Sequence, residues 1–205
     1  RGIILEVSLK TLPLPVASAT ISFELPEERA IQTLNQWGGK PLPVSASAWT
    51  DGQLRVRLCG AAAAVRAACE TLGGERLADN AAAAYWRGVR DQTDAFFAQG
   101  DAPFALLWRL SLPSSTAPLN LSGESLIEWG GALRWLKSGA DAVHIRAVVA
   151  KAGGHATLFR ADDQARVAAG VFQPLPAAML RIHRNLKAQF DPARIFNPGR
   201  MYANL

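Results

Sequence analysis

The chain has 205 residues, of which 49% are hydrophobic and 19% are charged, a composition that permits a substantial core and excludes an intrinsically disordered protein. Its formal charge is +5, yet the basic residues are scattered, so we predict no nucleic-acid partner. The sequence has no apolar run of roughly 18 residues, so we predict no transmembrane segment. Cys59 and Cys69 lie in Ala-rich apolar surroundings without the density of a disulfide framework, and we expect a reducing, cytoplasmic compartment.

The first 15 residues have the pattern of the end of another structural unit. Residues 3–9 form a near-continuous apolar run, typical of a strand that is buried on both faces and needs neighbouring strands. The sequence begins at Arg1 without a methionine, so we expect a truncation there. We interpret residues 1–12 as the last strand of a preceding domain and residues 11–18, which contain two prolines, as the crossover that leaves it. The alternative is an ordinary N-terminal strand of the same domain.

A first repeat unit is predicted over residues 18–78. Asp51-Gly52 separates two apolar runs, which indicates a hairpin with a two-residue turn. Gly73-Gly74 is typical of the end of a helix. The predicted elements of the unit are a strand at 19–25, a helix beginning at Pro26, a hairpin at 48–58, a helix at 61–72 and a strand at 75–78. This order is that of the ferredoxin-like, or split βαβ, arrangement, an antiparallel sheet covered on one face by two helices.

A second unit, over residues 104–160, repeats the hairpin and the second helix. Gly130-Gly131 takes the place of the first hairpin turn, and Gly153-Gly154 ends the helix. A Pro/Ser loop replaces the first helix. The predicted elements are a connecting helix at 81–97 with Asp79 or Asn80 as N-cap, a strand at 104–112, a hairpin at 127–136, a helix at 141–152 and a strand at 155–159. We therefore predict an α+β fold made of duplicated ferredoxin-like units, whose antiparallel sheet is covered by helices.

Few residues occur in a pattern that a metal or catalytic site requires. His144, His155 and His183 lie far apart without ligand spacing, so no metal site is predicted. The sequence also lacks glycine-rich phosphate loops and the nucleophile motif of hydrolases. His183 falls on the apolar stripe of the last helix, where we expect a buried imidazole.

Three residues are candidates for a catalytic site. His155 is predicted at the start of a strand, where it could act as a base or orient a substrate; a structural imidazole is the alternative. Arg109 and Arg134 lie within apolar strands, where a guanidinium can hold a carboxylate through two hydrogen bonds. The alternative for each is an arginine on the solvent-facing side of the sheet.

The C-terminal stretch QFDPARIFNPGRMYANL combines apolar side chains with two proline turns and a glycine. It resembles the C-terminal signature of the FAD-linked oxidases of the vanillyl-alcohol oxidase type. The opening GIILEVSLKTLPLP is similar to the strand that ends the flavin domain in that family. The stretches LIEWGGALRWL, GGHATLFR and GVFQPLP are most similar to the FAD-binding subunits of glycolate oxidase complexes. The residues that match the signature are Phe190, Asp191, Pro192, Ile195, Phe196, Asn197, Pro198, Gly199 and Arg200.

This resemblance implies a domain organisation and a cofactor. Residues 1–15 would be the last strand and linker of a truncated FAD-binding domain, residues 16–188 an α+β cap or substrate domain, and residues 189–205 a tail that returns to the FAD domain. FAD is the implied cofactor, with contacts from Asn197, Pro198, Gly199 and Arg200. Because the family's diphosphate loop would lie upstream of Arg1, the chain is expected to be a C-terminal fragment of a larger flavoprotein that is inactive alone.

The resemblance also implies partners. A small 2-hydroxy acid would be the substrate of the whole complex, and the other subunits would be a second flavoprotein and an iron–sulfur protein. The location would be cytoplasmic, with contact to the inner membrane only through partner subunits. Two different functions stay open on the residues alone: a non-enzymatic duplicated module for subunit docking, or a small-ligand sensor with its ligand between the two units.

Overall fold

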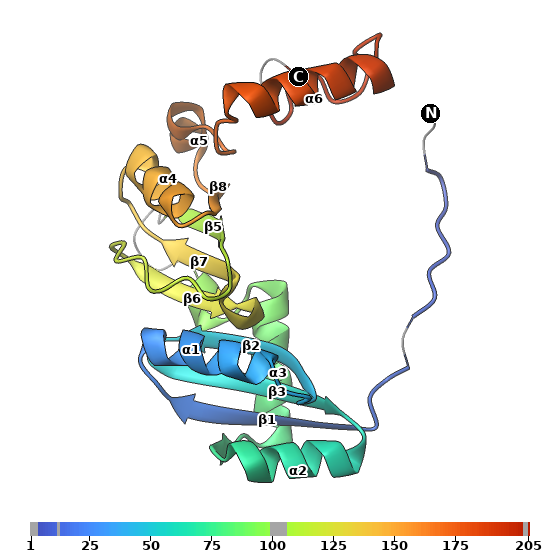
Figure 1. The fold of residues 1–205 in the computed structure, drawn as a ribbon, viewed down its shortest axis with the longest axis vertical. Helices are drawn as coiled ribbons and strands as arrows, with labels where there is room; N and C mark the ends of the chain where they lie inside the picture. Colours follow the sequence, from blue (N-terminus) through green and yellow to red (C-terminus); the bar gives the residue numbers. More distant parts are fainter. Residues whose placement is uncertain (1–3, 12, 99–105, 203–204) are drawn as a thin grey trace.

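A computed structural model describes residues 4–11, 13–98, 106–202 and 205 of the chain (Figure 1). In this part of the chain an eight-stranded antiparallel sheet is combined with six α-helices, which confirms the predicted α+β fold class. The strand order is β4-β1-β3-β2-β6-β7-β5-β8.

The first unit has the predicted ferredoxin-like order. Its sheet runs β4-β1-β3-β2, with antiparallel neighbours throughout. Asp51 and Gly52 form the turn of its hairpin with φ values of 46° and 75°, the backbone that a two-residue turn requires. The elements are β1 (Ala17–Glu24), α1 (Glu27–Gly38), β2 (Val44–Thr50), β3 (Gln53–Gly60), α2 (Ala62–Leu72) and β4 (Glu75–Arg76).

The second unit repeats this topology with one replacement. Its strands run β6-β7-β5-β8, the same order as in the first unit read from the opposite end. Residues 112–123 form a loop where the first unit has α1. The elements are β5 (Leu107–Ser111), β6 (Glu124–Glu128), β7 (Leu133–Lys137), α4 (Ala142–Lys151) and β8 (His155–Arg160).

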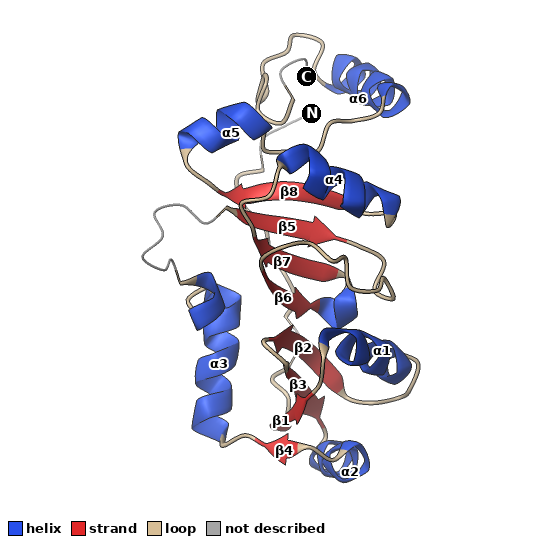
Figure 2. Ribbon diagram, turned by 90° about the vertical axis from the view of Figure 1, so that its left-hand side faces the viewer, coloured by secondary structure: helices blue, strands red, loops and turns tan. Residues whose placement is uncertain are grey.

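The two units meet edge to edge, so that the sheet is continuous. β2 pairs with β6 over only three residue pairs, Ala48↔Glu128, Trp49↔Ile127 and Thr50↔Leu126. Helices α1, α2 and α4 lie on one face of the sheet, and α3 (Asp79–Asp91) lies on the other (Figure 2). On the α3 face, a short 3₁₀ helix, η1 (Ala95–Phe97), contributes to a small core with Trp135. The α3 face is therefore only partly covered.

The connecting helix is shorter than predicted. Residues 81–97 were expected to form one helix, but α3 ends at Asp91 and Gln92 adopts a left-handed φ of 55°. Asp94 then starts η1 by accepting a hydrogen bond from the Phe96 backbone N–H at 3.1 Å. The N-cap is Ala78 rather than Asp79 or Asn80. The prediction was wrong here because a helical pattern of apolar residues does not reveal a break that a side-chain cap stabilises.

The second hairpin also differs from the prediction. Residues 129–132 separate the paired residues Glu128 and Leu133, so the turn has four residues rather than two. Its first three residues form a 3₁₀ helix, η2 (Trp129–Gly131). The Gly130-Gly131 dipeptide marks the turn but not its length, because glycine accommodates several turn types.

Residues 4–11 and helix α6 lie away from the sheet (Figure 1). Residues 4–11 form no strand and are exposed, so the strand expected at 1–12 is not formed within the described residues. Near the other end, α5 (Asp163–Ala169) is followed by α6 (Ala177–Phe190). His183 of α6 is only half-buried, with Nδ1 2.8 Å from the Met179 carbonyl oxygen, so the expected buried imidazole was wrong. The apolar stripe of α6 is exposed: Met179, Ile182, Leu186 and Phe190.

Candidate functional site

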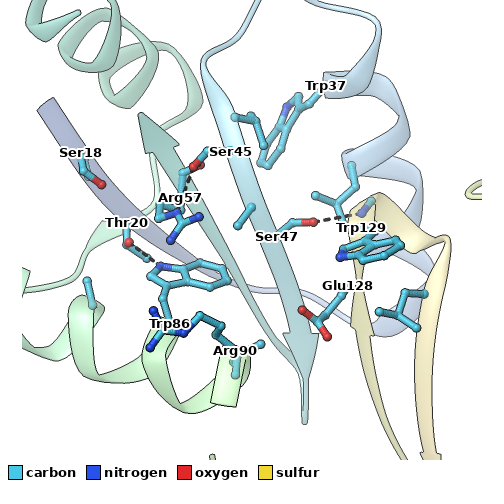
Figure 3. Close-up of a pocket in the computed structure, with 18 of the residues that line it drawn as sticks. Ser18, Thr20, Trp37, Ser45, Ser47, Arg57, Trp86, Arg90, Glu128 and Trp129 are labelled. Carbon is cyan, nitrogen blue, oxygen red and sulfur yellow. Dashed lines mark hydrogen bonds between the residues drawn. The ribbon is translucent and has the colours of Figure 1, made fainter. Parts of the chain in front are cut away.

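A cleft of about 1280 Å³ lies between α3 and the sheet, at the junction of the two units. β2 residues before the three pairs that join the units, and η2 residues after them, line it. Its walls come from the strands and α1 of the first unit, from α3, and from the β6, η2 and β7 segment of the second, with Arg109 of β5 (Figure 3). Both halves of the duplication therefore contribute side chains to one site.

Tryptophan side chains form much of the wall. Trp86 of α3 is fixed by a hydrogen bond from its indole N–H to Thr20 Oγ1 at 2.9 Å, and the Arg57 guanidinium lies 5.4 Å from its ring centroid. Trp129 is 67% exposed and has a left-handed φ of 52°. A bulky residue rarely adopts this backbone, and such strain is concentrated at functional sites. Trp37 and Trp135 complete the set of lining tryptophans.

The strained turn at Trp129 is held by the first unit. The Asn35 side-chain amide on α1 donates to the Ser114 carbonyl oxygen at 3.0 Å and to the Gly130 carbonyl oxygen at 3.3 Å. Ser47 Oγ accepts a hydrogen bond from the Gly130 backbone N–H at 3.2 Å. A Cβ atom on Gly131 would lie 2.3 Å from the Ser114 carbonyl oxygen, so no other residue fits there without a backbone shift. The turn is therefore positioned by contacts that cross the unit boundary.

Glu128 and Arg109 bring opposite charges to this end of the cleft. Trp135 Nε1 donates to Glu128 Oε2 at 2.7 Å. The Arg109 guanidinium lies 5.8 Å from the Trp129 ring centroid, and its Nη1 donates to Ser111 Oγ at 3.5 Å. Burial raises the pKa of the Glu128 carboxyl above its usual range, whereas the Trp135 hydrogen bond and the Arg109 charge act in the opposite direction.

Two of the three candidate catalytic residues share the face that carries the cleft. Directly paired residues of an antiparallel sheet lie on the same face, and pairs Glu128↔Leu133, Leu133↔Ser111 and Ser111↔His155 form one row across four strands. Arg109, two residues before Ser111, points to the same face. His155 is exposed. Its backbone lies three strand spacings, about 14 Å, from the backbone of Glu128. Arg109 thus lies between a carboxylate and an imidazole.

Arg134 lies on the opposite face of the sheet and is only 2% exposed. It pairs with Leu110, which packs against α4, and its guanidinium donates to the carbonyl oxygens of Thr116, Ala117 and Gly131. Its Nη1 is 3.8 Å from Glu27 Oε1 of α1. Burial lowers the pKa of Arg134 and raises that of Glu27, and their mutual attraction opposes both shifts. Arg134 therefore joins the loop at 112–123 to the first unit and cannot act with Arg109 on one ligand.

The four residues expected to contact a cofactor form an exposed turn after α6. Asn197, Pro198, Gly199 and Arg200 are all exposed, and Asn197 has a left-handed φ of 47°. The turn is anchored by Asp191, whose carboxylate accepts from the backbone N–H groups of Ile195 and Phe196, each at 3.0 Å. Lys187 Nζ lies 2.7 Å from the same carboxylate, and these donors lower the pKa of Asp191 to about 2. An amide and a guanidinium are thus presented on a fixed backbone.

The described residues contain no group of three or more His, Cys, Asp or Glu side chains placed to hold a metal ion. Among the helices of those same residues, none is long and apolar enough to cross a membrane.

The sequence did not single out Glu128, Trp129 or Asn35. Glu128 and Trp129 precede a Gly-Gly turn, where such residues are usually solvent-exposed, and Asn35 lies in an amphipathic helix pattern. The one sequence signal for a strained turn here was a tryptophan directly before two glycines. A turn that needs positive φ values rarely includes a tryptophan, so its presence is unusual.

The chain is similar to a known protein along its whole length. The chain is 44% identical over 204 residues to the protein described as glycolate oxidase subunit GlcE of Escherichia coli (strain K12). The match includes the full length of this chain and 54% of that protein, so the chain spans about half the length of the relative. No family model and no solved structure matches the sequence. The similarity to glycolate oxidase subunits drawn from the sequence motifs is confirmed.

Proposed function

We propose that this chain is the cap portion of an FAD-dependent subunit in a complex that oxidises glycolate or a similar 2-hydroxy acid. The observation that carries this proposal is the 44% identity, along the full length of the chain, to a glycolate oxidase subunit. In the proposed arrangement the partly open sheet face with its cleft covers a flavin bound by the rest of a longer protein. The chain alone is then inactive, because most of the cofactor site lies outside it.

The cleft supports the proposal through the charges near it. A 2-hydroxy acid is an anion at neutral pH, and Arg109 offers a guanidinium on the partly covered α3 face of the sheet. His155, on the same face and exposed, is the residue proposed to receive or orient a proton. A bound flavin would supply the hydride acceptor. Arg134 has no part in this proposal, since its guanidinium is used by backbone carbonyl groups on the other face.

The exposed turn after α6 fits a contact with part of FAD. The Asn197 amide can donate and accept hydrogen bonds, as the polar edge of a flavin ring requires, and Arg200 can approach a negative group. Asp191 fixes the backbone that carries them. Four residues are too few to enclose a cofactor of this size, so they would complete a site built mainly by another domain.

Exposed apolar surface supports the existence of further protein around the chain. Large apolar side chains of α6 and of the tail face solvent, and so do those of residues 4–9. An exposed apolar stripe such as that of α6 usually lies in an interface. We propose that the flavin domain covers part of it, and that a second flavoprotein and an iron–sulfur protein complete a cytoplasmic complex.

The same exposed surface also favours the second candidate, a docking module without catalytic function. The two proposals differ in what a longer protein does with glycolate. The test is to purify the full subunit with its partner subunits and to measure glycolate-dependent reduction of an artificial electron acceptor, using the wild type and Arg109→Gln. The flavoprotein proposal predicts turnover that Arg109→Gln lowers by at least tenfold through a higher KM, on the order of one lost charge-assisted hydrogen-bond pair. Absence of turnover in the wild type would favour the docking module.

A further inference from the structure

Glu128 has one carboxylate oxygen held and one that faces the cleft. Oε2 accepts the 2.7 Å hydrogen bond from Trp135, and within the described residues no hydrogen bond to Oε1 is formed. Figure 3 shows the carboxylate projecting from the end of β6 into the cleft. The Trp135 ring is itself packed edge-on against Phe97 and Phe159, with centroid distances of 5.5 and 4.8 Å. Glu128 is therefore a rigidly oriented acceptor rather than a mobile surface carboxylate.

Arg109 attracts Glu128 without forming an ion pair with it in the described part of the chain. The guanidinium instead contacts Ser111 and the Trp129 ring. Trp129 itself has a strained, left-handed backbone. A half-buried carboxylate and a guanidinium that line the same cleft without an ion pair between them leave two opposite charges open to a ligand. Such a pair of charges suits a ligand with a negative group for the arginine and a hydrogen-bond donor for the glutamate.

We propose that Glu128 is a substrate-binding residue that accepts the hydrogen bond of the 2-hydroxyl group while Arg109 holds the adjacent carboxylate. This inference rests on the proposed function and identifies the residue that distinguishes a hydroxy acid from a simple carboxylic acid. A site whose half-buried acceptor is covered by the bound ligand rejects an analogue that lacks the donor, because the acceptor then loses its water without gaining a partner. Trp135 acts through Glu128 as a positioning residue.

The test uses two carboxylate probes that the complex cannot oxidise, because neither has a hydrogen on the carbon next to its carboxylate. These are 2-hydroxy-2-methylpropanoate and 2,2-dimethylpropanoate, its analogue of similar shape in which a methyl group replaces the hydroxyl group. Their dissociation constants are measured by titration calorimetry on the full subunit complex. In the wild type the hydroxy acid is expected to bind about tenfold more tightly than the analogue. Glu128→Met should reduce this ratio to within about twofold, whereas Arg109→Gln should weaken both probes by about tenfold.

Glu128→Gln is the second variant, because it keeps the shape of the side chain and so protects the test against misfolding. It should reduce the ratio to an intermediate value, since an amide oxygen accepts a weaker hydrogen bond than a carboxylate. The control is Glu124→Gln, on the same strand, where the carboxylate is exposed and lies 3.8 Å from Lys137 Nζ. It should leave both constants unchanged.

The outcomes separate this inference from the proposed function. If the wild-type complex oxidises glycolate but Glu128→Met and Glu128→Gln retain the wild-type ratio, the assignment of Glu128 is overturned and the proposed function stands. If the wild-type complex neither oxidises glycolate nor binds either probe, both are overturned. Loss of the ratio in the glutamate variants alone supports the assignment.

Discussion

The indole N–H of Trp135 lies 2.7 Å from Glu128 Oε2, so a residue of β7 fixes a carboxylate of β6 at the junction of the two units. This contact orients the acidic side of the cleft, and the turn that follows it is held by α1 of the other unit. The geometry of the candidate site therefore depends on both copies of the duplicated unit. Substitutions at these contacts should separate effects on folding from effects on binding.

Replacement of Trp135 by phenylalanine should weaken both the fold and the orientation of Glu128. The variant keeps an aromatic ring but removes the hydrogen bond to a charged acceptor, so we expect a loss of about 2 kcal/mol in the free energy of unfolding. The pKa of Glu128 should rise further, because the lost bond favoured its charged form. Urea denaturation measures the first effect, and carboxyl NMR titration the second. An unchanged pKa would contradict the role assigned to this bond.

Two adjacent glycines should differ in their tolerance of alanine. Gly131→Ala would bring a Cβ atom to within 2.3 Å of the Ser114 carbonyl oxygen at a φ of 108°, so we expect destabilisation of about 3 kcal/mol. Gly130→Ala meets no atom within 4 Å and bears only the strain of a φ of 64°, at about 1 kcal/mol. Thermal unfolding of both variants checks the order. Equal destabilisation would show that the turn adjusts more freely than the structure indicates.

Replacement by methionine should mainly lower stability at Arg134 and mainly weaken ligand binding at Arg109. Arg134→Met removes a buried guanidinium from three carbonyl groups and from Glu27, so the free energy of unfolding should fall by about 3 kcal/mol. Arg109→Met loses a partly exposed contact over Trp129 and should cost less than about 1 kcal/mol. Only Arg109→Met should weaken binding of carboxylate ligands in the full subunit, by at least about tenfold at equal folded fraction. The reverse pattern would exchange the roles of the two arginines.

The turn after α6 should loosen in acid. The pKa of Asp191 is lowered to about 2, so its stabilisation is fully present above the usual aspartate value of about 3.9 and is lost as pH falls towards 2. Asp191→Asn removes the ion pair with Lys187 and should expose the backbone N–H groups of Ile195 and Phe196 to faster hydrogen exchange at neutral pH. The control is Asp163→Asn, an exposed residue of α5. Unchanged exchange in Asp191→Asn would contradict the anchor.

The order of elements was predictable because turn residues and apolar runs are local signals. Asp51-Gly52 located the first hairpin correctly, and Gly73-Gly74 the end of α2. The internal repeat then gave the ferredoxin-like topology of both units. The pairing of β2 with β6, which makes one sheet from two units, could not be read from the sequence, because edge strands carry no local mark of their partner.

The site was less predictable than the fold. Leu133 to Leu136 are all buried, so β7 is covered on both faces and an arginine within it need not face solvent. Arg134 and Arg109 therefore looked equivalent in the sequence although they lie on opposite faces. Glu128 was missed because its surroundings depend on Trp135 and on a turn held by Asn35, and these contacts arise only after the strands have paired.

The central claim is that this chain completes a flavin site in a longer protein. The most direct test is the visible absorption spectrum of a longer protein, expressed with the coding sequence that precedes Arg1. The 205-residue chain and an Asn197→Ala variant of the longer protein are purified and measured beside it. The account predicts flavin bands in the longer protein, no bands in the chain alone, and a lower flavin content in Asn197→Ala after gel filtration. A longer protein that stays colourless after FAD is supplied would contradict it.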